Sequence, residues 1–406
     1  METYLLDWAN LLLRWAHVIV AIAWIGSSFY FVFLDSSLTP PVDPVLREQG
    51  VAGELWAVHG GGFYHPLKFL VAPKSLPAHL HWFYWESYST WLTGFALFSV
   101  LYLFNAGTFL VDPHVHAWSA GAAAGTAIGF RVLFWLVYDR ICRWVGERRG
   151  GVGGDALVGA LVLVYVAAAS WAACSLYPGR AAFLMTGAML ATAMSANVFF
   201  WIIPGQRRVI AQMQAGAAVE AIHGQRAKQR SVHNTYFTLP VLVAMLSNHY
   251  GWLTQSAHNA AVLTLLMLAG ALIRHSFVAR HKALVQGRRV PWEYAAAGLA
   301  IIVGLVAWLA PAPAPAATGP LRPATLAEVE TVVGQRCQPC HNAVVHQKNV
   351  NLSSPALILA HAQQIVQQAV VLKAMPLNNA TQITPAERDL IGRWYAAGAP
   401  GDPPRP

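Results

Sequence analysis

Two cysteines near the carboxyl end of this 406-residue chain are separated by two residues and followed at once by a histidine: Cys337, Cys340 and His341. This C-x-x-C-H pattern attaches c-type haem, because both thiols form thioethers with the porphyrin while the adjacent imidazole binds the iron. The alternatives are a chance pentapeptide or half of a zinc site, which normally needs a second pair of Cys or His ligands at matched spacing. The pattern therefore predicts one covalent haem c with His341 as an iron ligand.

The opposite face of such an iron is commonly bound by a methionine sulfur. Met375 is the only methionine after residue 311, so it is the predicted second ligand. Two T-x-x-E capping boxes, Thr325 with Glu328 and Thr384 with Glu387, predict helices before and after these ligands. We expect residues 324–400 to form a small class I cytochrome c domain.

The rest of the chain has the composition of a membrane protein. Hydrophobic residues make up 56% of the sequence and charged residues 11%, whereas soluble domains carry about 25% charged residues. Apolar runs near the length that spans a bilayer predict eight transmembrane helices in residues 1–310, and residues 311–323 are a proline-rich linker. The predicted fold is all-α, an eight-helix transmembrane bundle followed by the cytochrome domain. The runs are 11–34, 82–104, 117–138, 156–176, 181–203, 235–249, 258–279 and 294–311.

The distribution of basic residues predicts the orientation. Sixteen of the 27 Lys and Arg residues lie in four segments on one side, whereas the alternate connections hold Arg180 alone. The positive-inside rule places the sixteen in the cytoplasm of a bacterium, and the N-terminus and cytochrome domain in the periplasm. This distribution also accounts for the net charge of +9 without a nucleic acid partner. The four segments are 35–80, 139–154, 204–230 and 280–292.

Ionisable residues inside the predicted helices are candidates for chemistry, because charge is costly in hydrocarbon. We expect Glu86, Arg131 and Arg274 to lie toward the cytoplasmic half, where histidines also gather. For any one histidine, the simpler interpretation is a solvated loop residue or a hydrogen bond between helices. An Arg could bind an anion while a His or Glu takes a proton. The candidate catalytic residues are His81, Glu86, Arg131, His233, Arg274 and His275.

Several stretches resemble the membrane-bound urate hydroxylase family, in which eight membrane helices are fused to a cytochrome c. The resemblance covers nearly the whole chain. The stretches that carry it are Arg14 to His17 with Trp24 to Gly26, Trp56 to His65, His81 to Glu86, His233 to Pro240, and Ser247 to His249.

The resemblance implies that urate is hydroxylated to 5-hydroxyisourate with water as the oxygen source, and that electrons leave through the cytochrome to a periplasmic acceptor or terminal oxidase. A hydrocarbon core of about 30 Å would separate an inner substrate site from a periplasmic haem. We therefore hypothesise a b-type haem in the membrane domain. His17 is a candidate ligand, since its helix is similar to the first helix of membrane haem proteins of the protoporphyrinogen oxidase type.

Two other functions remain open from the sequence. The helices could only anchor a cytochrome that shuttles electrons, although eight spans are excessive for an anchor. The substrate could instead be a quinol or another purine. Gly60 to Gly62 is not framed by a strand and a helix, so it predicts a tight turn and not a nucleotide-binding loop.

Overall fold

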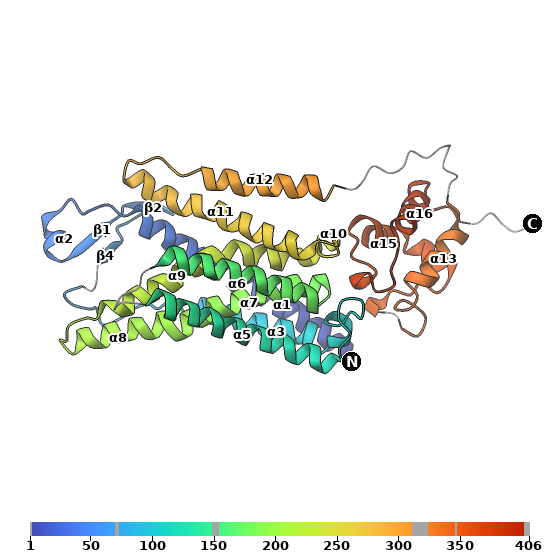
Figure 1. The fold of residues 1–406 in the computed structure, drawn as a ribbon, viewed down its shortest axis with the longest axis horizontal. Coiled ribbons are helices and arrows are strands. Elements are labelled where there is room, and N and C mark those ends of the chain that lie inside the picture. The colour runs from blue at the N-terminus through green and yellow to red at the C-terminus, as the bar shows by residue number, and fades with distance from the viewer. Residues whose placement is uncertain (1, 70–72, 148–153, 311–323, 346, 402–406) are drawn as a thin grey trace, which may run out of the picture.

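The computed structural model describes residues 2–69, 73–147, 154–310, 324–345 and 347–401, which form a long helical bundle with a smaller helical domain at one end (Figure 1). Five stretches of these residues are helices long and apolar enough to cross a bilayer, which takes about 20 residues. Each coincides with a run predicted from the sequence. They are Tyr4–Ser37, Ala120–Gly146, Asp155–Leu176, Gly179–Gln214 and Asn259–Val285.

The other three predicted runs are also helical and lie in the same bundle (Figure 1). They are α3 (Trp85–Phe98), which continues into a π-helical turn η1 (Ser99–Leu103), α9 (Ala221–Leu246) and α12 (Glu293–Trp308). These helices are shorter or more polar than the other five. The longer elements are α1 (Glu2–Ser37), α5 (Ala120–Gly146), α6 (Asp155–Leu176), α7 (Gly179–Asn197) with η2 (Val198–Ile202) and α8 (Ile203–Gln214), and α11 (Asn259–Val285).

Several helices continue past the ends of their apolar runs. Helix α5 extends to Gly146 and α9 already begins at Ala221, so parts of the segments predicted as cytoplasmic loops are helical. Charged residues in these turns pair with one another, as Asp139 does with Arg230 and Glu147 with Arg226, so the helices continue beyond their apolar runs. A hydropathy pattern registers the charge and not its partner.

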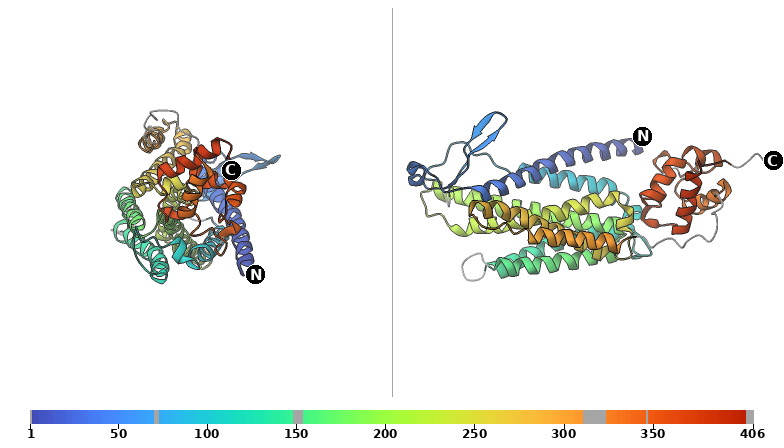
Figure 2. Two further views of the ribbon diagram at one scale, coloured as in Figure 1. Left: turned by 90° about the vertical axis from the view of Figure 1, so that its right-hand side faces the viewer. Right: turned by 90° about the horizontal axis from the view of Figure 1, so that it is seen from above.

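The two ends of the bundle differ in composition. The N-terminus and the C-terminal domain lie at the same end, which we call the domain end, as the two views of Figure 2 show. The opposite end, which we call the basic end, holds the connection between α8 and α9 and the last turns of α5 and α11 (Figure 1). Three short elements lie toward the domain end: α4 (Ala106–Phe109), η3 (Ser247–His249) and α10 (Gly251–Thr254).

The segment between α1 and α3 contains strands that the all-α prediction missed. Strand β1 (Val51–Glu54) pairs antiparallel with β4 (Leu67–Phe69), and β2 (Ala57–His59) pairs with β3 (Gly62–Tyr64). Gly60 and Gly61 join β2 to β3 with φ angles of 57° and 80°, which confirms the predicted tight turn. A short helix, α2 (Pro44–Glu48), precedes β1. The strands are three or four residues long, too short for a clear alternating pattern.

The C-terminal domain follows the predicted linker, residues 311–323, which lies outside the described residues. Both capping boxes are confirmed at the starts of α13 (Leu326–Arg336) and α16 (Pro385–Ala396). The two helices bury Val329, Val333, Ile391 and Trp394 in one apolar core. The remaining elements are η4 (Gln347–Asn349), α14 (Pro355–Ala360), α15 (Ala362–Ile365) with η5 (Val366–Val371), and η6 (Leu377–Asn379).

Acid is expected to loosen the strand segment through Glu54, whose carboxylate accepts the backbone N–H of Val42 at 2.8 Å and lies 2.6 Å from His65 Nε2. The Val42 N–H and then His65 lower the pKa of Glu54 below its ordinary value of 4.5. This stabilisation is complete above pH 4.5 and is lost as the pH falls through the lower pKa of the folded state. Hydrogen–deuterium exchange at Val42 should accelerate over that range. In Glu54→Gln the acceleration should be absent, and its persistence there would contradict this assignment.

Candidate functional site

The C-x-x-C-H segment begins where α13 ends. Cys337 caps the helix, and the backbone N–H groups of Cys340 and His341 both donate to its carbonyl oxygen, at 3.1 and 3.0 Å. The Nδ1 atom of His341 lies 3.2 Å from the carbonyl oxygen of Val350. An imidazole that donates from one nitrogen to a backbone carbonyl presents the other nitrogen to a metal. This donor set and its geometry fit haem c, with the two thiols as covalent anchors.

Met375 lies in a loop that the last helix holds in place. Its backbone N–H donates to the carbonyl of Gln368 at 3.0 Å, and its own carbonyl accepts Nη1 of Arg388 at 2.9 Å. Arg388 is a buried residue of α16 that also donates to the carbonyl of Ala369. The loop that carries the predicted sulfur ligand is therefore fixed from both sides. Arg388 was not identified from the sequence.

The same loop contacts the domain end of the bundle. The carbonyl of Lys373 accepts Nε2 of Gln255 at 2.9 Å, and a Cβ at Gly251 would lie 2.3 Å from that carbonyl oxygen. A second contact joins Gln382 to His114, 3.0 Å apart. Glycine at position 251 thus permits a close approach that any side chain would block. The C-terminal domain presents the Met375 loop to the membrane helices.

A buried polar group, which we call the Tyr138 cluster, lies inside the bundle where α5, α7 and α9 meet. The Tyr138 hydroxyl lies 2.8 Å from Nδ1 of His233 and accepts Nδ2 of Asn197 at 3.0 Å. Because Asn197 donates to the hydroxyl, the Tyr138 proton is free to be donated to His233. Asn197 Oδ1 is buried without a hydrogen-bond partner among the described residues. The cluster consists of Tyr138, Cys142, Asn197, His233 and Asn234.

An ion pair lies next to this cluster, on the side of the basic end. Asp139 contacts Arg230 at 2.7 Å, and Asp139 also accepts the indole N–H of Trp201 at 2.8 Å. Arg230 is 1% exposed and Asp139 is 6% exposed. The pair joins α5, η2 and α9. It neutralises two charges that would otherwise be buried alone, which would be costly.

Arg131 and Arg274 differ from Arg230, because neither forms an ion pair with any residue that the structure describes. The guanidinium of Arg131 lies 3.7 Å from the centre of the Phe98 ring, and that of Arg274 lies 3.7 Å from Phe29. Two nitrogens of each guanidinium are buried without a hydrogen-bond partner within the same described ranges. An uncompensated cation in hydrocarbon is unstable unless an anion binds it. Both arginines are therefore candidate anion ligands.

The two arginines lie apart. Arg131 packs on Phe98, the last residue of α3, and donates to the sulfur of Met185, in the second turn of α7, at 3.4 Å. The expectation that Arg131 lies toward the cytoplasmic half stays a prediction. Arg274 packs between α11 and α1.

The remaining candidates are distributed over the bundle. His275 Nδ1 lies 2.7 Å from the hydroxyl of Tyr236, while His233 belongs to the Tyr138 cluster. Glu86 lies in the first turn of α3 with Oε2 buried and unpaired among the described residues, and His81 precedes that helix with its ring against Phe83. Arg274 and His275 are consecutive on α11, and the contacts of the described residues do not join all six candidates into one site.

His17, the candidate ligand for a b-type haem, lies at the contact between α1 and α3. Its Nδ1 is 3.1 Å from the hydroxyl of Thr93, and a Cβ at Gly94 would lie 2.8 Å from its ring. The imidazole therefore fills the space left by the missing side chain of Gly94. These contacts pack α1 against α3, and the role of His17 as a haem ligand stays a prediction.

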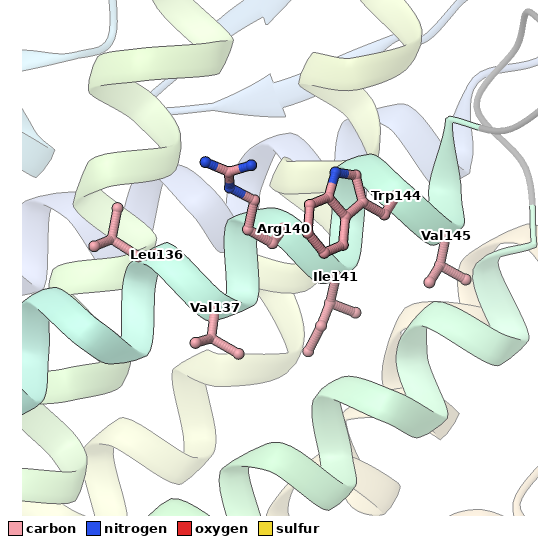
Figure 3. A pocket seen from close by; sticks show the side chains of 6 residues that line it. All are labelled: Leu136, Val137, Arg140, Ile141, Trp144 and Val145. Carbon is pink, nitrogen blue, oxygen red and sulfur yellow. The ribbon is translucent and has the colours of Figure 1, made fainter.

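A pocket of about 350 Å³ lies along one helix and is lined mainly by apolar side chains (Figure 3). Its lining residues all come from α5, and Leu136 and Trp144 are 46% and 64% exposed. An apolar groove of this kind on the outside of a membrane bundle is suited to lipid chains. Its lining residues are Leu136, Val137, Arg140, Ile141, Trp144 and Val145.

A comparison with known protein families covers the membrane helices as a whole. The model of the family described as urate oxidase N-terminal matches residues 3–310. The chain belongs to this family. The match covers the helices from α1 to α12 and confirms the resemblance for the membrane part. It indicates an oxidoreductase related to urate oxidation. The C-terminal domain lies outside the match. No curated protein and no solved structure matches the chain.

Within this urate oxidase domain, sequence reasoning missed most of the buried polar residues. Asp139 and Arg230 were counted as cytoplasmic loop residues, and Tyr138, Asn197 and Trp201 were not singled out. Asn197 could have been found, because an amide within a long apolar run needs a partner. The partners themselves come from helices that are distant in sequence.

The Asp139–Arg230 pair yields a prediction on stability. Asp139→Ala leaves a buried cation, so the free energy of unfolding should fall by about 3–5 kcal/mol. The double variant Asp139→Leu/Arg230→Met removes both charges and should recover most of that loss. Unfolding of the detergent-solubilised protein by a denaturing surfactant measures both. Glu293→Ala, which removes an exposed ion pair with Arg289, is the control and should change little. A double variant as unstable as Asp139→Ala would contradict this account.

Proposed function

We propose that this protein oxidises urate to 5-hydroxyisourate in the membrane and delivers the electrons to a haem c on its C-terminal domain. In this reaction urate gains the oxygen of one water molecule and releases two protons and two electrons. The observation that carries the proposal is the family match over residues 3–310 joined to a domain with a C-x-x-C-H segment. The docking of that domain on the bundle supports it.

Arg274 is the residue that we assign to the substrate anion. Its unpaired nitrogens can donate to oxygens of a planar anion, and Phe29 lies against the guanidinium. Such a pair is stronger in a low-dielectric bundle than in water. Arg131 has the same chemistry, and it is the second candidate.

Two histidines of the bundle are suited to take the protons that the oxidation releases. His275 follows Arg274 on α11 and pairs through Nδ1 with Tyr236, which leaves its other nitrogen for a proton. His233 lies one helical turn before Tyr236 on α9. Proton acceptance by a positioned imidazole is the commonest form of general base catalysis. Glu86 and His81 have no role in this assignment.

Electrons must then travel along the bundle to the domain end. A rise of 1.5 Å per residue places Arg274 roughly 22 Å from the start of α11. Haem c, when bound by Cys337, Cys340 and His341, accepts one electron at a time. The contact between Lys373 and Gln255 holds the Met375 loop against the bundle. A b-type haem with His17 as a ligand would shorten this path and stays part of the proposal as its intermediate electron store.

The proposed location is the inner membrane of a bacterium, with α3, α9 and α12 completing eight spans. The sixteen basic residues of the four predicted inner segments support a cytoplasmic basic end. The N-terminus and the C-terminal domain would then lie in the periplasm. This placement agrees with covalent haem attachment, which is completed outside the cytoplasm, and allows transfer to a periplasmic acceptor or terminal oxidase.

Urate should reduce the haem of the intact protein. In anaerobic membranes containing the mature holoprotein, we expect urate to produce the spectrum of ferrous haem c. Arg274→Gln should lower kcat/KM for urate by at least about tenfold, since a charge-assisted hydrogen bond contributes about 1.5–3 kcal/mol. Arg14→Gln is the matched control, because Arg14 is exposed on α1 and, within the described part of the chain, its hydrogen bond goes to nearby Asn10.

The same experiment separates the other two functions. Reduction by a quinol analogue with no response to urate would replace urate by a quinol as substrate. Reduction by neither compound would favour a cytochrome that only shuttles electrons. Either result would overturn the proposed function.

Ligation of the haem yields a separate prediction. Met375→Ala should retain covalent haem after denaturation, because the thioethers are intact, but should lose the far-red absorption band of methionine-ligated ferric haem. Cys337→Ala with Cys340→Ala should lose covalent haem altogether. Met185→Ala, which removes a membrane methionine, should leave the band unchanged. A normal band in Met375→Ala would show that another residue is the ligand.

A further inference from the structure

A second pocket, of about 230 Å³, opens at the basic end of the bundle. It lies where the last turns of α5, the η2–α8 segment and the start of α9 converge. Known pockets for drug-sized ligands hold about 300–1,000 Å³, so this one suits a smaller molecule. Its polar lining consists of three arginines and His223, which lies 2.9 Å from Glu220, and its rings are those of Phe200 and Trp201. The three arginines are Arg143, Arg208 and Arg226.

The arginines of this pocket carry more positive charge than the nearby carboxylates neutralise. Arg226 pairs with Glu147 at 2.7 Å, but Arg143 is 3.9 Å from Asp139, which already contacts Arg230 more closely. Arg208 forms no ion pair with any residue in the described part of the chain. The Nε atom of Arg226 is buried and has no hydrogen-bond partner among those residues. The pocket therefore has donors and charge available for an anion.

Aromatic rings line the same pocket. The guanidinium carbons of Arg143 and Arg226 each lie 5.7 Å from the centre of the Trp201 ring. Phe200 lies beside Trp201 in η2, a π-helical turn of a kind found often at functional sites. Ring faces next to guanidinium groups favour a flat ligand with delocalised negative charge. A compact tetrahedral anion would use the charge but not the rings.

Trp201 also connects the pocket to the interior of the bundle. Its indole N–H donates to Asp139, which precedes Cys142 and follows Tyr138 of the Tyr138 cluster. The pocket is thus one hydrogen bond from the buried Asp139–Arg230 pair. A ligand there lies at the cytoplasmic boundary of the polar interior on the proposed orientation.

We infer that this pocket binds a planar organic anion through Arg143, Arg208 and Arg226. Resting on the proposed function, the inference further identifies that anion as urate, held at the basic end before it reaches the buried site. The binding needs no covalent step. It assigns the three arginines to substrate capture and not to the chemistry.

Equilibrium dialysis of labelled urate tests the pocket without turnover. The holoprotein carries Arg274→Gln, which removes the proposed buried anion ligand, and it is held in phosphatidylcholine nanodiscs. Its haem is kept reduced so that urate is not oxidised. Arg208→Gln should weaken urate binding by about tenfold, as expected for one charge-assisted hydrogen bond. Glu147→Gln should tighten binding, because it releases Arg226 from its carboxylate. If these residues had only a structural role, the Arg208→Gln and Glu147→Gln variants would not change urate affinity in opposite directions.

Arg207→Gln is the matched control, since Arg207 is on the same helix, lies near Trp82 and does not line the pocket. It should bind urate like the parent protein. Equal affinities for Arg208→Gln and Arg207→Gln would overturn the inference. Stronger competition by inorganic phosphate than by unlabelled urate would also overturn the inference. Loss of urate binding in phosphatidylglycerol nanodiscs would overturn it too, since both results indicate a site for a lipid headgroup.

The proposed function and this inference fail separately. If urate binds with the expected variant pattern but never reduces the wild-type haem, the capture site stands and the oxidation does not. If urate reduces the haem while Arg208→Gln binds normally, the oxidation stands and the capture site does not.

Discussion

The cost of burying charge in hydrocarbon governs the arrangement of this protein. Asp139 and Arg230 are tolerated in the bundle because they contact each other at 2.7 Å and because Trp201 donates to the carboxylate. This interaction joins α5, η2 and α9, and the Tyr138 cluster is built on the same helices. Arg131 and Arg274 have no such partner within the described residues, so the same cost makes them candidates for a ligand. The energetic cost of a buried charge thus distinguishes the charges that are paired within the bundle from the arginines that are candidates for binding a ligand.

The protein divides its work between two ends. The basic end gathers arginines and aromatic rings around a small pocket, whereas the domain end receives the C-terminal domain. Gly251 permits the close contact there, because a larger residue would collide with the Lys373 carbonyl. The proposed reaction needs substrate capture at one end and electron delivery at the other. The proposed anion and proton ligands lie on the helices between these ends.

Local sequence was sufficient where function depends on adjacent residues. The C-x-x-C-H segment, the capping boxes and the tight turn at Gly60 and Gly61 were each predicted from a few neighbouring residues, and the last two are confirmed. The five long apolar spans were predicted for the same reason, since burial in lipid depends on a continuous run. The family could be identified because its motifs are also short stretches.

The partners of the buried polar groups were decided by tertiary structure alone. Arg230 looked like a loop residue because hydropathy counts its charge, whereas its pairing with Asp139, 91 residues earlier, makes burial favourable. The contact of His17 with Gly94, 77 residues later in the chain, was likewise set by the packing of α1 on α3. The six catalytic candidates could not be sorted from sequence, since distances between helices depend on how the bundle packs. Sequence alone determined which helices are apolar enough to cross a membrane, because that depends on a continuous run of residues. The fold determined which charges are paired, because pairing is a contact between distant parts of the chain.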